Sequence, residues 1–383
     1  MAKLVRITTV PISVEKLLGR QLTFMDRYFE VTAISADKDY LDRVGVELGV
    51  KTHSIEMTRK ITPLQDLKSL WQMYRYIKKE KPEIVHTHTP KAGLIGMMAS
   101  KLAGVKIRLH TVAGLPLMEA TGLKRRVLNA VEKLTYSCAT YVYPNSQGLY
   151  DFILKEKLGT ADKLRVIGSG STNGIDLDHF DPTLFPADSK SELRKEMAIA
   201  EDDFVFVFVG RLVRDKGINE LISVFKTLQF SNPPKLKLLL VGPLEQDLDP
   251  LSQEVINEIE TNPNIISVGF QKDVRPYFAI SNVLVFPSYR EGFPNVVLQA
   301  LAMGIPALVS DINGCNEIVE HQKNGLIFPP KNAAALQNAM QLCTNSELYR
   351  KLEADSRSSV MKYRQTLIWE LLKENYDNLL RSL

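Results

Sequence analysis

The stretch Phe204-Val-Phe-Val-Phe-Val-Gly-Arg-Leu-Val-Arg-Asp-Lys-Gly217 decides the fold of this 383-residue chain. Six consecutive β-branched or aromatic residues predict a strand that is buried on both faces, as in a parallel sheet covered by helices. The strand ends at a glycine, and Arg211 and Lys216 follow it directly. Ligands of open parallel sheets bind outside the carboxyl ends of the strands. The segment therefore predicts an α/β layer with two cations at its binding edge.

A second segment repeats this arrangement about eighty residues later. The apolar run Val283–Phe286 is followed by Pro-Ser-Tyr-Arg-Glu291-Gly-Phe-Pro294-Asn-Val-Val-Leu-Gln299. Glu291 brings a carboxylate to the same edge, and the turn at Pro294 leads into a helix whose N-terminus favours phosphate. Arg211 and Lys216 suit a diphosphate. A diphosphate beside a carboxylate that binds hydroxyl groups is the requirement of a nucleotide-sugar site.

Strands and helices alternate along the whole chain, which predicts two doubly wound α/β domains in tandem with a deep cleft between them. The first set of predicted strands is Leu4–Thr9, Phe29–Ile34, Ile84–Thr87, Ile107–Thr111, Tyr141–Pro144 and Leu164–Ile167. The second set is Phe204–Val209, Leu236–Val241, Ile265–Val268, Val283–Phe286, Ala307–Ser310 and Gly325–Phe328. The breaker-rich stretch 168–182 is interpreted as the hinge. We expect an N-terminal domain over 1–176 and a C-terminal domain over 177–365, with a final helix at about 366–383 packing back on the first.

Composition places the chain among cytoplasmic globular proteins. Residues are 45% hydrophobic and 24% charged, and the sequence contains no apolar run long enough to span a membrane and no signal-peptide core. Three widely separated cysteines predict buried thiols in a reducing compartment. Residues 1–180 carry 27 Lys and Arg against 18 Asp and Glu, which favours an anionic partner or a solvated basic surface. Nucleic acid is not expected, because no aromatic residues interleave with the charge.

With these two segments in place, the chain resembles the GT-B glycosyltransferases of the retaining, family-4 type. The family's hallmark pairs two glutamates separated by seven residues. Here Glu291 is followed at the second position by Gln299, a departure that leaves an amide to bind the nucleotide ribose. The pair Arg211 and Lys216 is similar to the family's donor-diphosphate pair. The resemblance implies two Rossmann-like domains, with a nucleotide sugar, expected to be UDP-linked, bound to the C-terminal one.

The N-terminal half resembles a particular branch of this family. The stretches His86-Thr-His-Thr-Pro-Lys-Ala-Gly93 and His110-Thr-Val-Ala-Gly114 are similar to those of capsule and O-antigen transferases, which extend a saccharide linked to a polyprenyl diphosphate. The resemblance implies a polysaccharide-synthesis enzyme on the inner face of the cell membrane, with this acceptor bound to the N-terminal domain. It also implies four catalytic groups: His110, Arg211, Lys216 and Glu291. The expected donor-binding residues are Gly19, Arg211, Lys216, Phe293, Pro294, Asn295, Val296 and Gln299.

Several motifs have competing interpretations. We expect no cofactor. We also expect no metal, because Arg211 and Lys216 supply the positive charge that the diphosphate needs, and because His86 and His88 are taken to face opposite sides of a strand and so could not share a metal ion. Lys91 is a candidate for a phosphate or acceptor contact. The glycines of 168–174 are not read as a dinucleotide motif, since their spacing is wrong and no helix follows. The basic amphipathic stretch Leu123–Tyr136 fits either a membrane surface or a core cover.

Two other functions remain open from the sequence. A nucleotide-sugar 2-epimerase of the same fold would need carboxylate bases, which the sequence does not place. A non-catalytic protein that binds sugar nucleotides stays possible because Gln299 replaces the usual glutamate.

Overall fold

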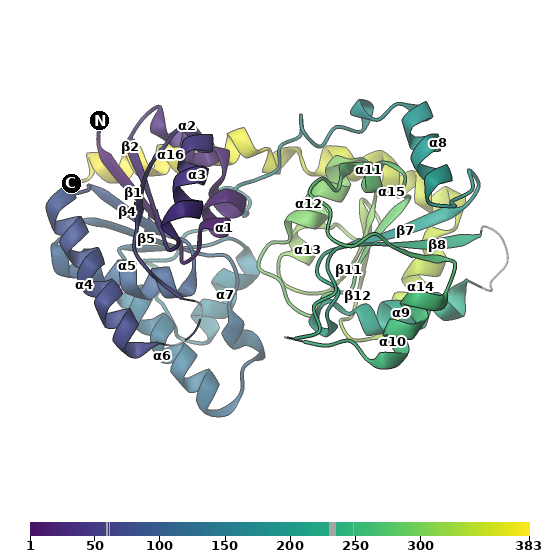
Figure 1. Cartoon of the computed structure of the whole chain (residues 1–383), viewed down its shortest axis with the longest axis horizontal. Helices are drawn as coiled ribbons and strands as arrows, with labels where there is room; N and C mark the ends of the chain where they lie inside the picture. The colour runs from purple at the N-terminus through teal and green to yellow at the C-terminus, as the bar shows by residue number, and fades with distance from the viewer. Residues whose placement is uncertain (59, 61, 230–234, 248) are drawn as a thin grey trace. The chain divides into compact units, whose positions relative to one another are not determined.

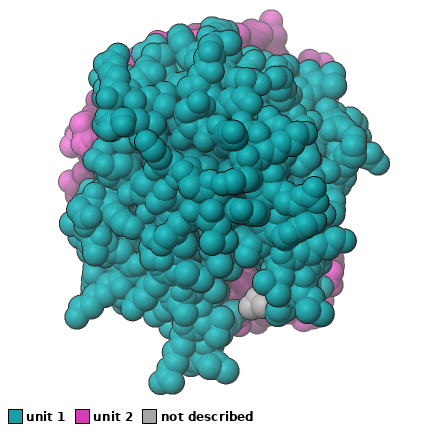
Figure 2. All heavy atoms as spheres, turned by 90° about the vertical axis from the view of Figure 1, so that its left-hand side faces the viewer, with its two compact units in different colours: residues 1–174, 365–383 teal, residues 175–364 magenta. Residues whose placement is uncertain are grey.

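The computed structural model describes residues 1–58, 60, 62–229, 235–247 and 249–383. The chain divides into two compact units, coloured separately in Figure 2. Unit 1 consists of residues 1–174 and 365–383, and unit 2 consists of residues 175–364. Each contains a six-stranded parallel sheet with helices packed against it (Figure 1). The expectation of two doubly wound α/β layers is confirmed.

The sheet of unit 1 has the strand order β3-β2-β1-β4-β5-β6, which is that of a dinucleotide-binding α/β fold. Its strands are β1 (Lys3–Ile7), β2 (Glu30–Ser35), β3 (Lys51–Ser54), β4 (Ile84–Thr87), β5 (Ile107–Val112) and β6 (Tyr141–Pro144). The strand predicted at Leu164–Ile167 is wrong, because only a single bridge from Leu164 to Val142 forms there. The strand that was not predicted is β3, because its polar sequence at the edge of the sheet contains no apolar run.

The helices of unit 1 form two layers. They are α1 (Pro11–Ser13), the π-helical turn η1 (Val14–Leu18), α2 (Arg20–Asp26), α3 (Lys38–Leu48), α4 (Pro63–Glu80), α5 (Pro90–Ala103), η2 (Pro116–Glu119), α6 (Gly122–Cys138), α7 (Gln147–Lys155) and α16 (Gln365–Arg381). Helices α4, α5 and α6 cover one face of the sheet, with α5 between the other two (Figure 1). Helices α2, α3 and α16 share a core with the opposite face. The C-terminal helix therefore belongs to unit 1.

The sheet of unit 2 has the order β12-β11-β10-β7-β8-β9. Its strands are β7 (Phe204–Val209), β8 (Leu236–Val241), β9 (Ile265–Ser267), β10 (Val283–Phe286), β11 (Ala307–Ser310) and β12 (Gly325–Phe328). Its helices are η3 (Pro182–Leu184), α8 (Ala187–Glu196), η4 (Arg214–Lys216), α9 (Ile218–Leu228), α10 (Gln253–Thr261), α11 (Arg275–Ala279), α12 (Asn295–Ala302), α13 (Cys315–Ile318), α14 (Ala333–Cys343), α15 (Ser346–Ser359) and η5 (Met361–Tyr363). Every residue of β7 is buried, as its sequence predicts.

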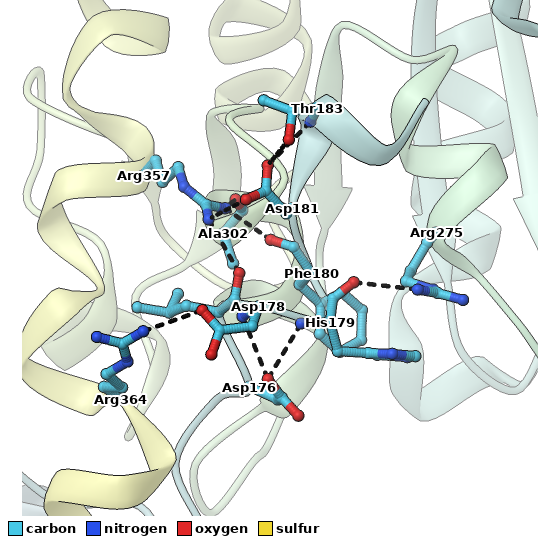
Figure 3. A network of polar contacts seen from close by, with 11 residues as sticks. Asp176, Asp178, His179, Phe180, Asp181, Thr183, Arg275, Ala302, Arg357 and Arg364 are labelled. Carbon is cyan, nitrogen blue, oxygen red and sulfur yellow. Dashed lines mark hydrogen bonds and ion pairs between the residues drawn. The ribbon is translucent and has the colours of Figure 1, made fainter. Parts of the chain in front are cut away.

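The chain enters unit 2 through a segment held by three arginines, drawn in Figure 3. The Arg357 guanidinium donates to the carbonyl oxygens of Leu177 and Phe180 at 2.9 and 2.6 Å. Arg364 pairs with Asp178, and Arg275 donates to the carbonyl oxygen of His179. These contacts fix the segment to the body of unit 2 directly after the unit boundary.

All three cysteines are buried as free thiols, as expected. Within the described residues, no helix is both long enough and apolar enough to cross a bilayer.

Candidate functional site

The cationic pair predicted from the sequence lies at the carboxyl end of β7. Arg211 follows the strand after Gly210, and Lys216 ends the short helical turn η4. The Arg211 Nη1 atom lies 2.9 Å from Glu245 Oε2, and the Arg211 side chain is 43% exposed. Because a guanidinium has five N–H donors, one carboxylate leaves it several donors for a ligand.

The Glu291 carboxylate follows β10 and joins the same edge. Its Oε1 atom pairs with the Lys216 ammonium and accepts a hydrogen bond of 2.7 Å from the Ser288 hydroxyl. The Asn313 amide donates to the main-chain carbonyl oxygens of Glu291 and Gly292, at 3.1 and 2.7 Å. Lys216 and Glu291 therefore meet in space, and their side chains are mostly buried, at 17% and 16% exposure.

The turn after Glu291 depends on a close approach by Gly314. Gly314 has φ +75°, and a Cβ there would lie 2.3 Å from the carbonyl oxygen of Gly292. Only glycine meets both conditions without strain. This packing shapes the turn that leads through Pro294 into α12, whose first turn carries N–H groups without intrahelical partners.

The predicted donor residues of α12 separate into two groups. Phe293 and Pro294 are buried, and the Phe293 ring packs edge-on against Tyr363 at a centroid distance of 5.3 Å. Asn295, Val296 and Gln299 are not buried, and the spacing of Gln299 from the other two puts all three on one side of the helix. The unburied side of α12 thus holds three of the residues that the sequence assigned to the donor.

Gly19 in unit 1 lies after β1, within an unusual turn. It ends the π-helical turn η1 and precedes α2, with φ +46° and ψ −135°. π-Helical turns often occur at functional sites. Gly19 therefore lies in a loop at the carboxyl edge of the unit 1 sheet, in a conformation that favours glycine.

His110 lies inside β5 and is 3% exposed. Its Nδ1 atom lies 2.7 Å from the Thr87 hydroxyl, and a Cβ added to Gly93 of α5 would lie 2.4 Å from the His110 ring. Burial lowers the pKa of His110 to about 4, so the ring is neutral at physiological pH. These contacts are those of a packed core residue, and a catalytic role for His110 stays a prediction.

One other expectation for unit 1 is wrong. Residues i and i+2 of a strand share a face, so His86 and His88 do not face opposite sides; their ring centroids lie 4.2 Å apart. Both rings have other partners, since His86 contacts Tyr376 and Thr111 and His88 accepts a hydrogen bond of 2.9 Å from the Arg6 Nε–H. Burial is the main cause that holds the pKa of both histidines well below the usual value. The charge of Arg6 and the neighbouring histidine rings lower it further.

Lys91 is also engaged within unit 1. Its ammonium lies 2.7 Å from both carboxylate oxygens of Asp66 in α4, and the side chain is mostly buried. The pair joins the beginnings of α4 and α5. Lys91 thus has a structural partner, and a phosphate contact would have to compete with it.

Sequence reasoning missed three polar residues of the unit 2 site: Glu245, Ser288 and Asn313. Each follows a strand of the sheet, namely β8, β10 and β11. Inspection of every residue after a predicted strand would have named them as candidates. The partners of Glu245 and Asn313 are 34 and 22 residues away and could be assigned only from the structure, whereas Ser288 lies three residues before its partner Glu291.

Comparisons with known proteins match both halves of the chain. Residues 189–359 match the family of glycosyl transferases group 1, and residues 20–170 match the glycosyl transferase 4-like domain. A capsular polysaccharide biosynthesis glycosyltransferase of Staphylococcus aureus is 33% identical over 382 residues, which cover 99% of this chain and 98% of that protein.

Two further relatives carry more specific names. An Escherichia coli UDP-Gal:alpha-D-GlcNAc-diphosphoundecaprenol alpha-1,3-galactosyltransferase is 29% identical, over 84% of this chain and 81% of that protein. A Campylobacter jejuni N,N'-diacetylbacillosaminyl-diphospho-undecaprenol alpha-1,3-N-acetylgalactosaminyltransferase is 26% identical, over 93% of each chain.

Solved structures share the fold. The Anabaena protein HepE in complex with UDP superimposes with a TM-score of 0.79 at 19% identity, over 98% of this chain and 100% of that one. A glycosyltransferase from Rickettsia africae superimposes with a TM-score of 0.82 at 18% identity, over 100% of this chain and 99% of that one. The sequence matches, the two parallel sheets and these neighbours agree: the chain belongs to the GT-B glycosyltransferases of the family-4 type.

Proposed function

We propose that this glycosyltransferase moves a sugar, with retention of its anomeric configuration, from a UDP-sugar to a saccharide carried on a polyprenyl diphosphate. The product would serve the synthesis of a bacterial surface polysaccharide. The observation that carries the proposal is the pairing of Lys216 with Glu291 at the carboxyl edge of the unit 2 sheet, the edge at which Arg211 follows β7 and α12 follows β10. The names of the relatives from Escherichia coli and Campylobacter jejuni support the acceptor class, and the first of them also names a UDP-sugar.

The chemistry follows from where charge develops. Cleavage of the bond between the anomeric carbon and the diphosphate leaves negative charge on UDP and positive charge on the sugar. Arg211, Lys216 and the α12 N-terminus would stabilise the diphosphate, an electrostatic contribution that is often dominant in catalysis. These groups provide the positive charge that a metal supplies elsewhere, so the proposed reaction needs no metal.

Glu291 has a supporting role in this proposal. Its carboxylate is held by Lys216 and Ser288, which suits a group that accepts hydrogen bonds from sugar hydroxyls. The acceptor hydroxyl would attack from the side of the departing diphosphate. The leaving phosphate oxygen would take the hydroxyl proton, so the new glycosidic bond forms as the old bond breaks and no covalent enzyme intermediate is required.

The place of action follows from the acceptor. A polyprenyl-linked saccharide stays in the bilayer, so we propose that the protein works on the inner face of the cell membrane as a peripheral protein. Unit 1, with its basic balance, would bind the acceptor, and unit 2 would bind the donor.

A direct assay tests the proposed reaction. The protein would be incubated with a panel of UDP-sugars and a synthetic polyprenyl-diphosphate saccharide, in buffer with excess chelator. We expect acceptor-dependent UDP release and an α-linked product whose anomeric configuration, read by NMR, matches that of the donor. Loss of turnover in chelator that magnesium or manganese restores would contradict metal independence.

The same assay separates the alternatives. An epimerase would convert the UDP-sugar without the acceptor, whereas a binding protein would retain UDP-sugars without consuming them. A product of opposite anomeric configuration would show an inverting transferase.

A further inference from the structure

Helix α6 of unit 1 turns its apolar stripe outward. Leu123, Val127, Ala130 and Leu134 recur at the spacing of one helical face, and all four are exposed, Leu123 to 77%. Surface helices of globular proteins normally bury such a stripe against the core. Among the described residues, the apolar face of α6 is therefore exposed to solvent.

The inward face of α6 is mixed, because Leu128, Tyr136 and Cys138 pack against the apolar core of unit 1 beside polar groups. It carries the buried carboxylate Glu132 and the buried Thr135 and Tyr136. Arg125 also turns inward, where its guanidinium pairs with Glu156 of the segment after α7 at 2.7 Å. Burying a carboxylate while exposing leucines is unfavourable for a helix that only covers a core. The orientation of α6 thus requires another explanation.

Cations border the apolar stripe of α6. Arg126 and Lys133 lie along one side of it, Lys124 lies on the other, and all three are exposed. The only acidic residue of the helix is Glu132, which is buried. An outward face of leucines and lysines without acidic residues matches the boundary of an anionic bilayer, where acyl chains meet negative headgroups.

Helix α4 continues this surface. Leu64, Leu67 and Trp71 share one of its faces and are exposed, with Leu64 at 86% and Trp71 at 57%. The Arg75 guanidinium lies 4.6 Å from the centroid of the Trp71 ring. An aromatic ring beside a cation is typical of residues at a membrane interface.

The two helices present their stripes from one layer of unit 1. Helix α5 packs against both α4 and α6 (Figure 1), and its Leu94 and Met98 are only half-buried. Because α4 and α6 each follow a parallel strand, both begin at the carboxyl edge of the sheet, where the Gly19 loop also lies. The exposed apolar residues of α4 are in its first half, close to this edge.

We propose that this outer surface of α4 and α6 inserts into an anionic lipid bilayer, with leucines, Val127 and Trp71 among the acyl chains and the flanking cations among the headgroups. The inference rests on the proposed function, because it supplies the contact with the membrane that holds the acceptor. The proposal attributes membrane binding to the insertion of apolar side chains as well as to the attraction between the cations and the anionic headgroups.

Vesicle binding tests the surface directly. The whole protein would be sedimented with vesicles of phosphatidylglycerol and phosphatidylcholine over a range of salt concentrations. We expect binding that weakens with salt but does not vanish, because apolar insertion is not screened. The triple variant Leu123→Ser, Val127→Ser, Leu134→Ser should bind at least about tenfold less.

A matched control is available in the same unit. Val46 lies on α3, on the opposite face of the sheet, and is 85% exposed. Val46→Ser should bind vesicles as the unchanged protein does. Equal binding by Val46→Ser and the triple variant would overturn the proposal.

The two tryptophans offer a second readout. Trp71 is on the proposed surface, whereas Trp369 is only 6% exposed. Vesicles should shift the Trp71 emission to shorter wavelength and make it quenchable by brominated lipid, and Trp71→Phe should abolish both effects. Unchanged emission from Trp71 would contradict insertion of α4.

The outcome can be separated from that of the proposed reaction. UDP binding in solution needs no bilayer, so the triple variant should bind UDP as the unchanged protein does. If the unchanged protein turns over UDP-sugars but does not bind vesicles, the surface alone is overturned. If it binds vesicles through this surface but neither binds nor turns over UDP-sugars, the function alone is overturned. A dimer in lipid-free solution that the triple variant abolishes, with vesicle binding unaffected, would assign the surface to a second copy instead.

Discussion

Arg211 lies at the carboxyl end of β7, and among the described residues its side chain pairs with Glu245 alone, so its proposed role can be tested in isolation. Arg211→Ala should reduce kcat/KM by about 2–4 kcal/mol of transition-state stabilisation, because a fixed cation is lost where charge develops. The melting temperature should hardly change, since the exposed ion pair with Glu245 contributes about 0–1 kcal/mol. Kinetics and thermal unfolding would be measured on the same preparation.

Arg214 provides the matched control for this prediction. It lies in the same turn and pairs with Asp249 at 3.0 Å, much as Arg211 pairs with Glu245. Arg214→Ala should leave kcat/KM nearly intact. A fully active Arg211→Ala enzyme would refute the diphosphate role, and an equal loss in both variants would point to general electrostatics of the turn.

Gln299 is the residue at which the chain departs from the family pattern. Its position on the unburied side of α12 fits a contact with the nucleotide. An ionised acceptor binds hydroxyl groups more strongly than an amide does, so Gln299→Glu should keep activity and tighten UDP binding by roughly 0.5–1.5 kcal/mol. Calorimetry with UDP would show this. Unchanged affinity in both Gln299→Glu and Gln299→Ala would mean that residue 299 does not hold the ribose.

At the scale of single residues, the sequence predicted where the candidate site groups lie in the fold but not which side chains they contact. Arg211, Lys216 and Glu291 could be predicted because each follows a run that can only be a buried strand. The pairing of Lys216 with Glu291 could not, since 75 residues separate them. The error at His86 and His88 was one of strand geometry, whereas the tight contact of His110 with Gly93 depends on how α5 packs.

Among the elements, α6 contains an ionisable group whose burial has a measurable consequence. Burial raises the pKa of Glu132 to about 7, partly offset by Tyr136. The unfolded chain releases this proton near pH 4.3, so folding loses stability as pH rises from there to about 7. Glu132→Gln removes the ionisation and should increase the unfolding free energy at pH 8 by roughly 2–3 kcal/mol, with little change at pH 4.

Urea unfolding at both pH values would measure this difference. The control is Glu47→Gln, which changes an exposed carboxylate of α3 and should give the same small effect at both pH values. If the gain from Glu132→Gln were equal at pH 4 and pH 8, proton release from Glu132 would not be its cause.

The elements also show what an amphipathic pattern leaves open. The strands of unit 2 were predicted nearly to the residue because their sequences are continuously apolar. Strand β3 was missed because an edge strand with half-exposed residues needs no such run. The helix at Leu123–Tyr136 was predicted, but its sequence pattern shows only that one face is apolar. The pattern does not show whether this face lies against the core or against solvent. Only the packing of Glu132 and Tyr136 against the core establishes that Leu123 and Leu134 of α6 face outward.

At the scale of the whole molecule, the chain leaves unit 1 after Gly174 and returns to it at Gln365. The returning helix α16 buries its apolar residues against the sheet of unit 1, and its Tyr376 hydroxyl contacts His86 of β4. Unit 1 is therefore incomplete until residues 365–383 have been synthesised, whereas every residue of unit 2 precedes them.

Truncation after Arg364 should consequently disrupt unit 1 and spare unit 2. Loss of α16 removes the buried side chains Leu372, Tyr376 and Leu379. Each loss lowers the unfolding free energy by about 2–5 kcal/mol, and the three together are comparable to the whole stability of a typical domain. Hydrogen exchange should show fast exchange throughout residues 1–174 and retained protection in the strands of unit 2. A chain that ends at Leu380 lacks only exposed residues and should match the full-length protein. Full protection of β1 and β4 in the shorter chain would show that α16 is dispensable for the fold of unit 1.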